Sequence, residues 1–141
     1  MKNIILIFIA FLAAVSAGYS QVNVPAAVRT AFSKKFPDAK SIKWEKESKT
    51  EFEANFTMMD VKCSANYSIT GEWLETESTI SLDALPAKVK AAISSKYKTD
   101  EIKGAAKIET VKGKTQYEID VKKGGKSLEL FYDEEGMEVK S

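Results

Sequence analysis

Apolar and polar residues alternate along several segments of the chain, as they do in strands that have one face on a core and one face in water. In the segment 51–58 the even-numbered residues are apolar, and in the segment 117–121 the odd-numbered residues are apolar. The alternation continues through 61–69 and 128–132. Glycine turns follow 61–69 at Gly71, precede 117–121 at Gly113, separate 117–121 from 128–132 at Gly124-Gly125, and follow 128–132 at Gly136. Ile42 with Trp44, and Ala106 with Ile108, mark one further strand before each set.

Two other segments have apolar residues at helical spacing. Val28, Phe32 and Phe36 recur every four residues, and Val89 and Ile93 do the same further along the chain. Each segment follows a proline in the pattern Val/Leu-Pro-Ala, as expected at the first turn of a helix. The helical segments align with an offset of 61 residues and the central strands with an offset of 65, so the chain contains an internal repeat.

The pattern therefore predicts an α+β fold made of two tandem repeats, at about residues 22–80 and 81–141. Each repeat is expected to contain one helix followed by three or four antiparallel strands. The strands of both repeats would form one continuous antiparallel sheet with the two helices packed on one face, because that arrangement buries both sets of apolar side chains.

The first 20 residues have the layout of a secretory signal peptide. Lys2 precedes an apolar run from Ile4 to Val15, and small residues follow it, with cleavage plausible after Ala17 or after Ser20. The alternative is an uncleaved N-terminal anchor, although the run is shorter than the roughly 20 residues that a membrane span needs. The sequence thus predicts a periplasmic or secreted protein in which residues 21–141 form a single domain.

The composition argues against several classes of function. With 21 basic and 20 acidic residues, the chain lacks the basic excess that nucleic acids and anionic membrane surfaces require. It has no histidine and a single cysteine, Cys63, which favours neither a catalytic triad nor a zinc site, so no enzyme activity, cofactor or metal is predicted. The turn Asp133–Gly136 lacks the alternating ligands of a calcium loop. Glu51 with Glu53, and Glu75 with Glu77, are interpreted as solvated strand residues rather than as acid/base pairs.

The second repeat resembles a PepSY domain. The resemblance rests on Tyr117–Val121, Gly124-Gly125-Lys126 and the segment Leu128–Gly136, which is a strand ending in Tyr-Asp followed by a glycine turn. Phe52–Glu75 is similar to a degenerate copy. Two such units behind a signal peptide resemble the PepSY-like, β-lactamase-inhibitor-protein-like family of small exported bacterial proteins. That resemblance implies a sheet with an open face that grips a partner, and inhibition of an envelope hydrolase or peptidase only by analogy of fold.

Strand alternation suggests where a partner would bind. It places Trp73 and Phe131 on the outward face of the sheet, where large aromatic side chains are candidate anchors for a protein or peptide. The polar residues expected around them are Glu51, Glu53, Asn55, Asn66, Glu75, Glu118 and Asp120. The leading hypothesis is a non-catalytic envelope protein that binds a protein or peptide with basic groups. The alternatives are a sensor or carrier of a small ligand or metal, and a purely structural envelope component.

Overall fold

The structure, a computed structural model, describes residues 22–140, so the predicted signal peptide lies outside the described residues. The first half contains α1 (Ala26–Lys35), β1 (Lys40–Lys46), β2 (Glu51–Met58), β3 (Val61–Ser68) and β4 (Trp73–Ile80). The second half contains α2 (Ala87–Ser94), β5 (Ile102–Thr110), β6 (Thr115–Lys123), β7 (Lys126–Asp133) and the short β8 (Glu138–Val139). Two 3₁₀ turns, η1 (Leu82–Ala84) and η2 (Thr99–Glu101), flank α2.

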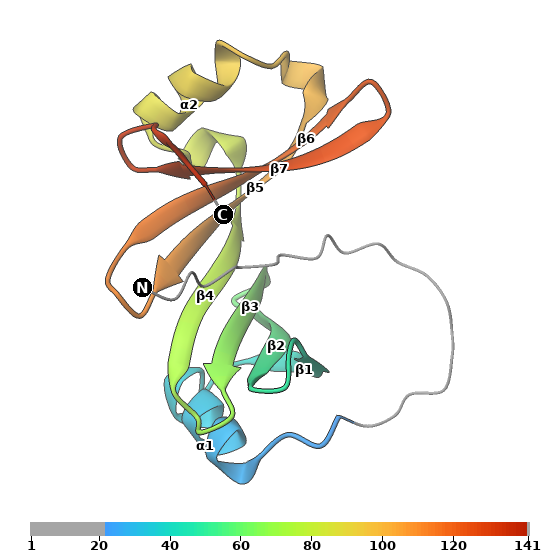
Figure 1. Cartoon of the computed structure of the whole chain (residues 1–141), viewed down its shortest axis with the longest axis vertical. Coiled ribbons are helices and arrows are strands. Elements are labelled where there is room, and N and C mark those ends of the chain that lie inside the picture. Colours follow the sequence, from blue (N-terminus) through green and yellow to red (C-terminus); the bar gives the residue numbers. More distant parts are fainter. Residues whose placement is uncertain (1–21, 141) are drawn as a thin grey trace.

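The eight strands form one antiparallel sheet in which spatial order follows sequence order from β1 to β8. The helices α1 and α2 lie toward the two ends of this twisted sheet (Figure 1). Residues directly opposite one another on neighbouring strands share a face. The row Cys63, Ser78, Lys107, Tyr117 and Tyr132 therefore carries the helix-covered face from one repeat into the other. This confirms the predicted α+β fold with two helices on one face of a continuous sheet.

Each repeat has its own hydrophobic core beneath its helix. In the first, Phe32 of α1 contacts the rings of Trp44, Phe56 and Tyr67, with its ring centroid 5.1–6.2 Å from theirs. In the second, apolar residues of α2 pack on β5, β6 and β7, where Leu85, Val89, Ile93, Ile119 and Tyr132 are buried. Cys63 is a buried free thiol in the first core. Burial of these apolar side chains is the main force that holds each helix to the sheet.

An extra residue in β1 changes the expected inward position of Ile42. Lys40 lies opposite Thr57 and Lys43 lies opposite Asn55, so β1 has one residue more than β2 over this stretch, and Ser41 has a positive φ of 54°. This β-bulge turns Ile42 out of the core, and its side chain is 44 % exposed. Trp44, beyond the bulge, packs against the first core as the alternation predicts.

Equivalent glycine turns join sheet and helix in the two repeats. Gly71, between β3 and β4, and Gly136, between β7 and β8, have φ values of 87° and 75°. A Cβ atom at Gly71 would lie 2.7 Å from the carbonyl oxygen of Ala27 in α1, and one at Gly136 would lie 2.6 Å from that of Lys88 in α2. The repeat thus places a glycine where the turn touches the first turn of each helix.

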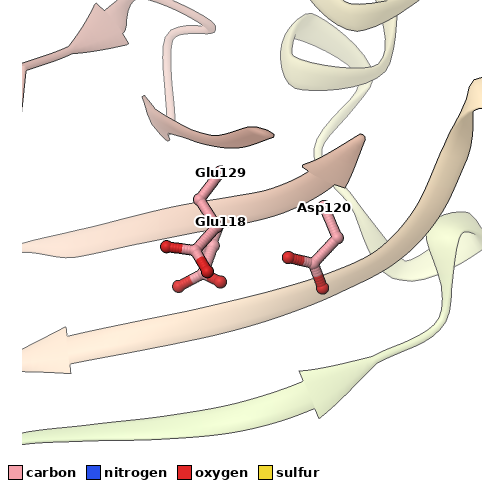
Figure 2. Close-up of side chains that lie close together, drawn as sticks. All are labelled: Glu118, Asp120 and Glu129. Carbon is pink, nitrogen blue, oxygen red and sulfur yellow. The ribbon is translucent and has the colours of Figure 1, made fainter. Parts of the chain in front are cut away.

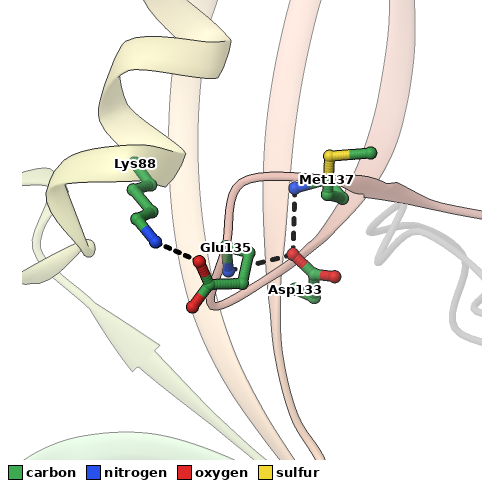
Figure 3. A network of polar contacts seen from close by, with 4 residues as sticks. All are labelled: Lys88, Asp133, Glu135 and Met137. Atoms are coloured by element: carbon green, nitrogen blue, oxygen red, sulfur yellow. Dashed lines mark hydrogen bonds and ion pairs between the residues drawn. The ribbon is translucent and has the colours of Figure 1, made fainter.

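Polar contacts hold the second of these turns in place (Figure 3). The Asp133 Oδ1 atom accepts hydrogen bonds from the backbone N–H groups of Glu135 and Met137, at 3.0 and 2.9 Å. The Lys88 ammonium on α2 forms an ion pair with the Glu135 carboxylate. Asp133 therefore shapes the turn, and Lys88 joins it to the helix.

Candidate functional site

The face of the sheet opposite the helices, called here the open face, carries most of the residues predicted to bind a partner. Phe52 and Ala54 point into the core, so the residues that alternate with them point to the open face. The same rule applies on β6, where Ile119 and Val121 are in the core. Among the predicted residues, the open face carries Glu51, Glu53, Asn55, Asn66, Glu75, Glu118, Asp120 and Phe131. Phe131 lies between Glu118 on β6 and Val139 on β8.

Trp73 lies on the other face, so its predicted outward orientation is wrong. Asn66 pairs with Glu75, but the next residue, Tyr67, pairs with Trp73 rather than with Leu74. Leu74 is the extra residue of a β-bulge, and one extra residue moves the residues beyond it to the opposite face. Trp73 consequently packs against the first core, with the Lys35 ammonium of α1 3.9 Å from the centre of its ring.

We expect Trp73→Ala to reduce stability rather than to remove a binding anchor. The indole Nε1–H donates a hydrogen bond to Thr76 Oγ1 at 2.9 Å, and the ring joins β4 to α1 through Lys35. Loss of these contacts and of a half-buried ring should lower the free energy of unfolding by about 2 kcal/mol. Urea denaturation measures this effect, and an unchanged midpoint would show that Trp73 does not support the fold.

The centre of the open face is buried although neither α1 nor α2, the α-helices among the described residues, covers it. Glu75 and Glu118 are each only 6 % exposed, and Ala106 and Ile108 between them on β5 are also buried. The interpretation of Glu75 as a solvated residue is therefore wrong. Because β5 contributes small and apolar side chains here, the carboxylates on β4 and β6 are surrounded by the strands and by one another rather than by water.

Burial and mutual repulsion raise the pKa of these carboxyl groups above the usual carboxyl range. The pKa is about 7 for Glu53 and Glu75 and about 8 for Glu77 and Glu118, with burial as the largest cause in each group. Neighbouring carboxylates add to the shift, since Glu118 acts on Glu77 and Glu53 acts on Glu75. Desolvation and like charges both favour the neutral form of an acid.

No basic side chain in the described part of the chain forms an ion pair with these groups. Within residues 22–140, the ion pairs are Lys88–Glu135, Lys96–Glu138 and Lys107–Glu109, and none involves a carboxylate at the centre of the open face. One carboxylate oxygen each of Glu75, Glu77 and Glu118 is buried without a hydrogen-bond partner. A buried polar group without a partner costs free energy that a bound cation or hydrogen-bond donor would recover. The arrangement is suited to binding positive charge.

Two open-face residues, Glu77 and Glu129, were not among the residues predicted to bind. Glu77 lies two residues after Glu75 on β4, and Glu129 lies two residues before Phe131 on β7. The spacing of two would have placed both on the predicted face. Their proximity to carboxylates of other strands depends on the order and register of the strands, which local alternation does not indicate.

The sequence matches the model of a known protein family in two overlapping segments, residues 16–66 and 50–139. That family is described as “putative beta-lactamase-inhibitor-like, PepSY-like”. The chain belongs to the PepSY-like family. The resemblance inferred from the Tyr-Asp and glycine-turn pattern is thereby confirmed for nearly the whole PepSY-like chain.

Solved structures of similar fold come from Bacteroides species. A DUF2874 family protein of Bacteroides ovatus is 25 % identical, with a TM-score of 0.71 over 82 % of this chain and 84 % of that one. A “putative periplasmic” protein of Bacteroides eggerthii is 21 % identical, with a TM-score of 0.75 over 83 % and 86 %. A BLIP-like protein of Bacteroides fragilis is 23 % identical, with a TM-score of 0.67 over 82 % and 84 %.

The last two structures are less than 25 % identical to this PepSY-like protein, so they show that the fold is similar and nothing more. No curated protein matches the sequence. In the part of the chain that the structure describes, neither helix is long and apolar enough to cross a membrane.

Proposed function

We propose that this PepSY-like protein is an exported, non-catalytic binding protein that holds a protein or peptide partner against its open face. The observation that carries the proposal is the group of buried, unpartnered carboxylates of Glu75, Glu77 and Glu118 at the centre of that face. A partner with lysine or arginine side chains would give these oxygens hydrogen-bond donors and positive charge. Phe131 would add apolar contact at one side of the same surface.

Two further observations support this proposal. The predicted signal peptide and the “putative periplasmic” relative both favour the cell envelope as the site of action. The chain has no histidine, and its one thiol is buried in the first core, which argues against nucleophilic catalysis. Inhibition of an envelope hydrolase or peptidase is the finer form of the proposal, and it rests on the family description and on the BLIP-like relative.

Site-specific photo-crosslinking in the native envelope tests which face meets a partner. A photoreactive residue would replace Ser64 or Asn66 on the open face, and in matched controls Arg29 or Lys90 on the exposed sides of the helices. We expect one partner to be cross-linked from the open-face positions and not from the helix positions. Crosslinks from the helix positions, or from neither set, would contradict the proposal.

The same assay tests the role of the carboxylates. Glu53→Gln removes an ionisable carboxyl group from the open face, and Glu72→Gln removes one from an exposed turn outside it. Because the partner's basic groups are expected to meet Glu53, the first substitution should reduce the crosslinked fraction and the second should leave it unchanged. Equal yields in both variants would show that binding does not depend on the acidic centre.

A further inference from the structure

Three carboxylates on β6 and β7, on the open face, lie close enough to share a single ion. Glu118 and Asp120 are two residues apart on β6, and Glu129 on β7 lies directly opposite Asp120. Each side chain offers one oxygen, and these oxygens all lie within 4.8 Å of one another. Figure 2 shows the Glu118 and Glu129 carboxylates side by side, with Asp120 next to them on the same strand as Glu118.

A second observation, independent of this proximity, concerns Glu118. Its side chain is only 6 % exposed, and its Oε2 atom is buried without a hydrogen-bond partner. No lysine or arginine among residues 22–140 forms an ion pair with any of the three carboxylates. A buried carboxylate normally has a charged or hydrogen-bonding partner or coordinates a metal, and Glu118 lacks the first two.

The backbone beside Asp120 leaves room for its carboxylate. Gly104, next to a β-bulge in β5, pairs with Asp120, and a Cβ atom there would lie 3.0 Å from Asp120 Oδ2. The absence of a side chain at position 104 allows the Asp120 carboxylate to lie close to β5. Asp120 is exposed whereas Glu118 is buried, so an ion could enter from solvent past Asp120 and reach Glu118.

We propose that Glu118, Asp120 and Glu129 form a site for one divalent cation of the hard, oxygen-preferring class, and that the cation is Ca²⁺. Calcium takes oxygen ligands at 2.3–2.6 Å in flexible geometry, so two of its ligands are at most about 5.2 Å apart. The three oxygens, which lie within 4.8 Å of one another, meet this limit. Magnesium requires shorter bonds and stricter octahedral geometry, and zinc and copper prefer nitrogen or sulfur ligands. The site differs from a calcium loop because its ligands come from two neighbouring strands, which explains why no loop pattern marks it.

Isothermal titration calorimetry, in which Ca²⁺ is added to the purified protein at pH 8 and constant ionic strength, tests the site. We expect saturable binding of one ion with a Kd on the order of 10⁻⁴ to 10⁻³ M, the range of extracellular calcium modules. Bound Ca²⁺ would offset the repulsion among the three carboxylates, so it should also raise the melting temperature. Absence of saturable binding up to about 10 mM, well above that range, or equal effects of Mg²⁺ and Ca²⁺, would overturn the proposal.

Three variants separate the site from general charge effects. Glu129→Gln should lower the Ca²⁺ affinity by about tenfold or more, since affinity depends on the number of charged ligands. Glu134→Gln, which removes one charge from the exposed turn after β7, should leave it unchanged. Gly104→Ala keeps every charge but displaces the Asp120 carboxylate, and should also weaken binding.

Circular dichroism verifies that each variant folds. If Glu129→Gln did not fold, Asp120→Asn, at an exposed position, would replace it. Equal affinity in Glu129→Gln and Glu134→Gln would refute the site.

Discussion

Gly136→Ala is expected to lower the free energy of unfolding by about 3 kcal/mol, from two additive causes. The positive φ of Gly136 is unfavourable for a residue with a side chain, which costs roughly 1–2 kcal/mol. The added Cβ would lie 2.6 Å from the backbone oxygen of Lys88, a distance that requires the turn and α2 to move apart. That movement disturbs the Lys88–Glu135 ion pair and the packing of α2 on the sheet. Gly71→Ala should lower the free energy of unfolding by a similar amount, because its Cβ would meet the backbone of α1 in the same way.

Gly124→Ala is the matched control for this prediction. Gly124 also has a positive φ, of 57°, but nothing lies within 4 Å of the position that its Cβ would take. Gly124→Ala should therefore show only the conformational cost of the positive φ, roughly 1–2 kcal/mol. Urea denaturation of the three variants measures the difference. Equal losses in Gly136→Ala and Gly124→Ala would mean that the contact with the helix contributes nothing.

Stability is expected to fall as pH rises from about 5 to about 9, because of the carboxyl groups at the centre of the open face. Glu75 and Glu77 have pKa values of about 7 and about 8 in the folded protein, above the ordinary value of 4.5 that the unfolded chain would have. At a pH between 4.5 and the raised pKa values, these carboxyl groups hold protons in the folded state that they have lost in the unfolded state. The stabilisation is complete below pH 4.5 and is lost as pH rises through 7 and 8. The free energy of unfolding should decrease by on the order of a few kcal/mol over this pH range.

Thermal or urea unfolding between pH 5 and 9 measures this dependence. Glu77→Gln replaces a titrating group by a neutral one, so the variant should be more stable than the native protein at pH 9 and should lose less stability with rising pH. Glu72→Gln, in an exposed turn, should follow the native curve. A native stability that rises over this range would show that the central carboxylates are ionised and stabilised in the folded protein.

Much of the fold could be predicted because it depends on local patterns. The alternation around Phe52 and Tyr117 and the helical spacing of Phe32 and Ile93 indicate which side chains face a core. The internal repeat then limits the arrangement to two similar halves. Trp73 could not be placed in this way, because a β-bulge of one residue reverses the face and leaves no local mark in the sequence.

The candidate site was only partly predictable for a different reason. Alternation identifies Glu75 and Glu118 as residues of the polar face, but it implies that they are solvated. Their burial depends on β5, which lies between their strands and presents the small or apolar Ala106 and Ile108 on that face. Only the order of the strands shows that carboxylates from distant segments gather around them.

The two free edges of the described sheet have a consequence for self-association. An unpaired edge strand can template the addition of strands from other molecules, which leads to fibres. Here the first edge, β1, carries three lysines, Lys40, Lys43 and Lys46, and is distorted by the bulge at Ser41, while the last edge, β8, is two residues long. The lysines and the bulge of β1, and the short length of β8, each hinder the addition of further strands. The eight-stranded sheet can therefore leave one face uncovered by helices without polymerising through its edges.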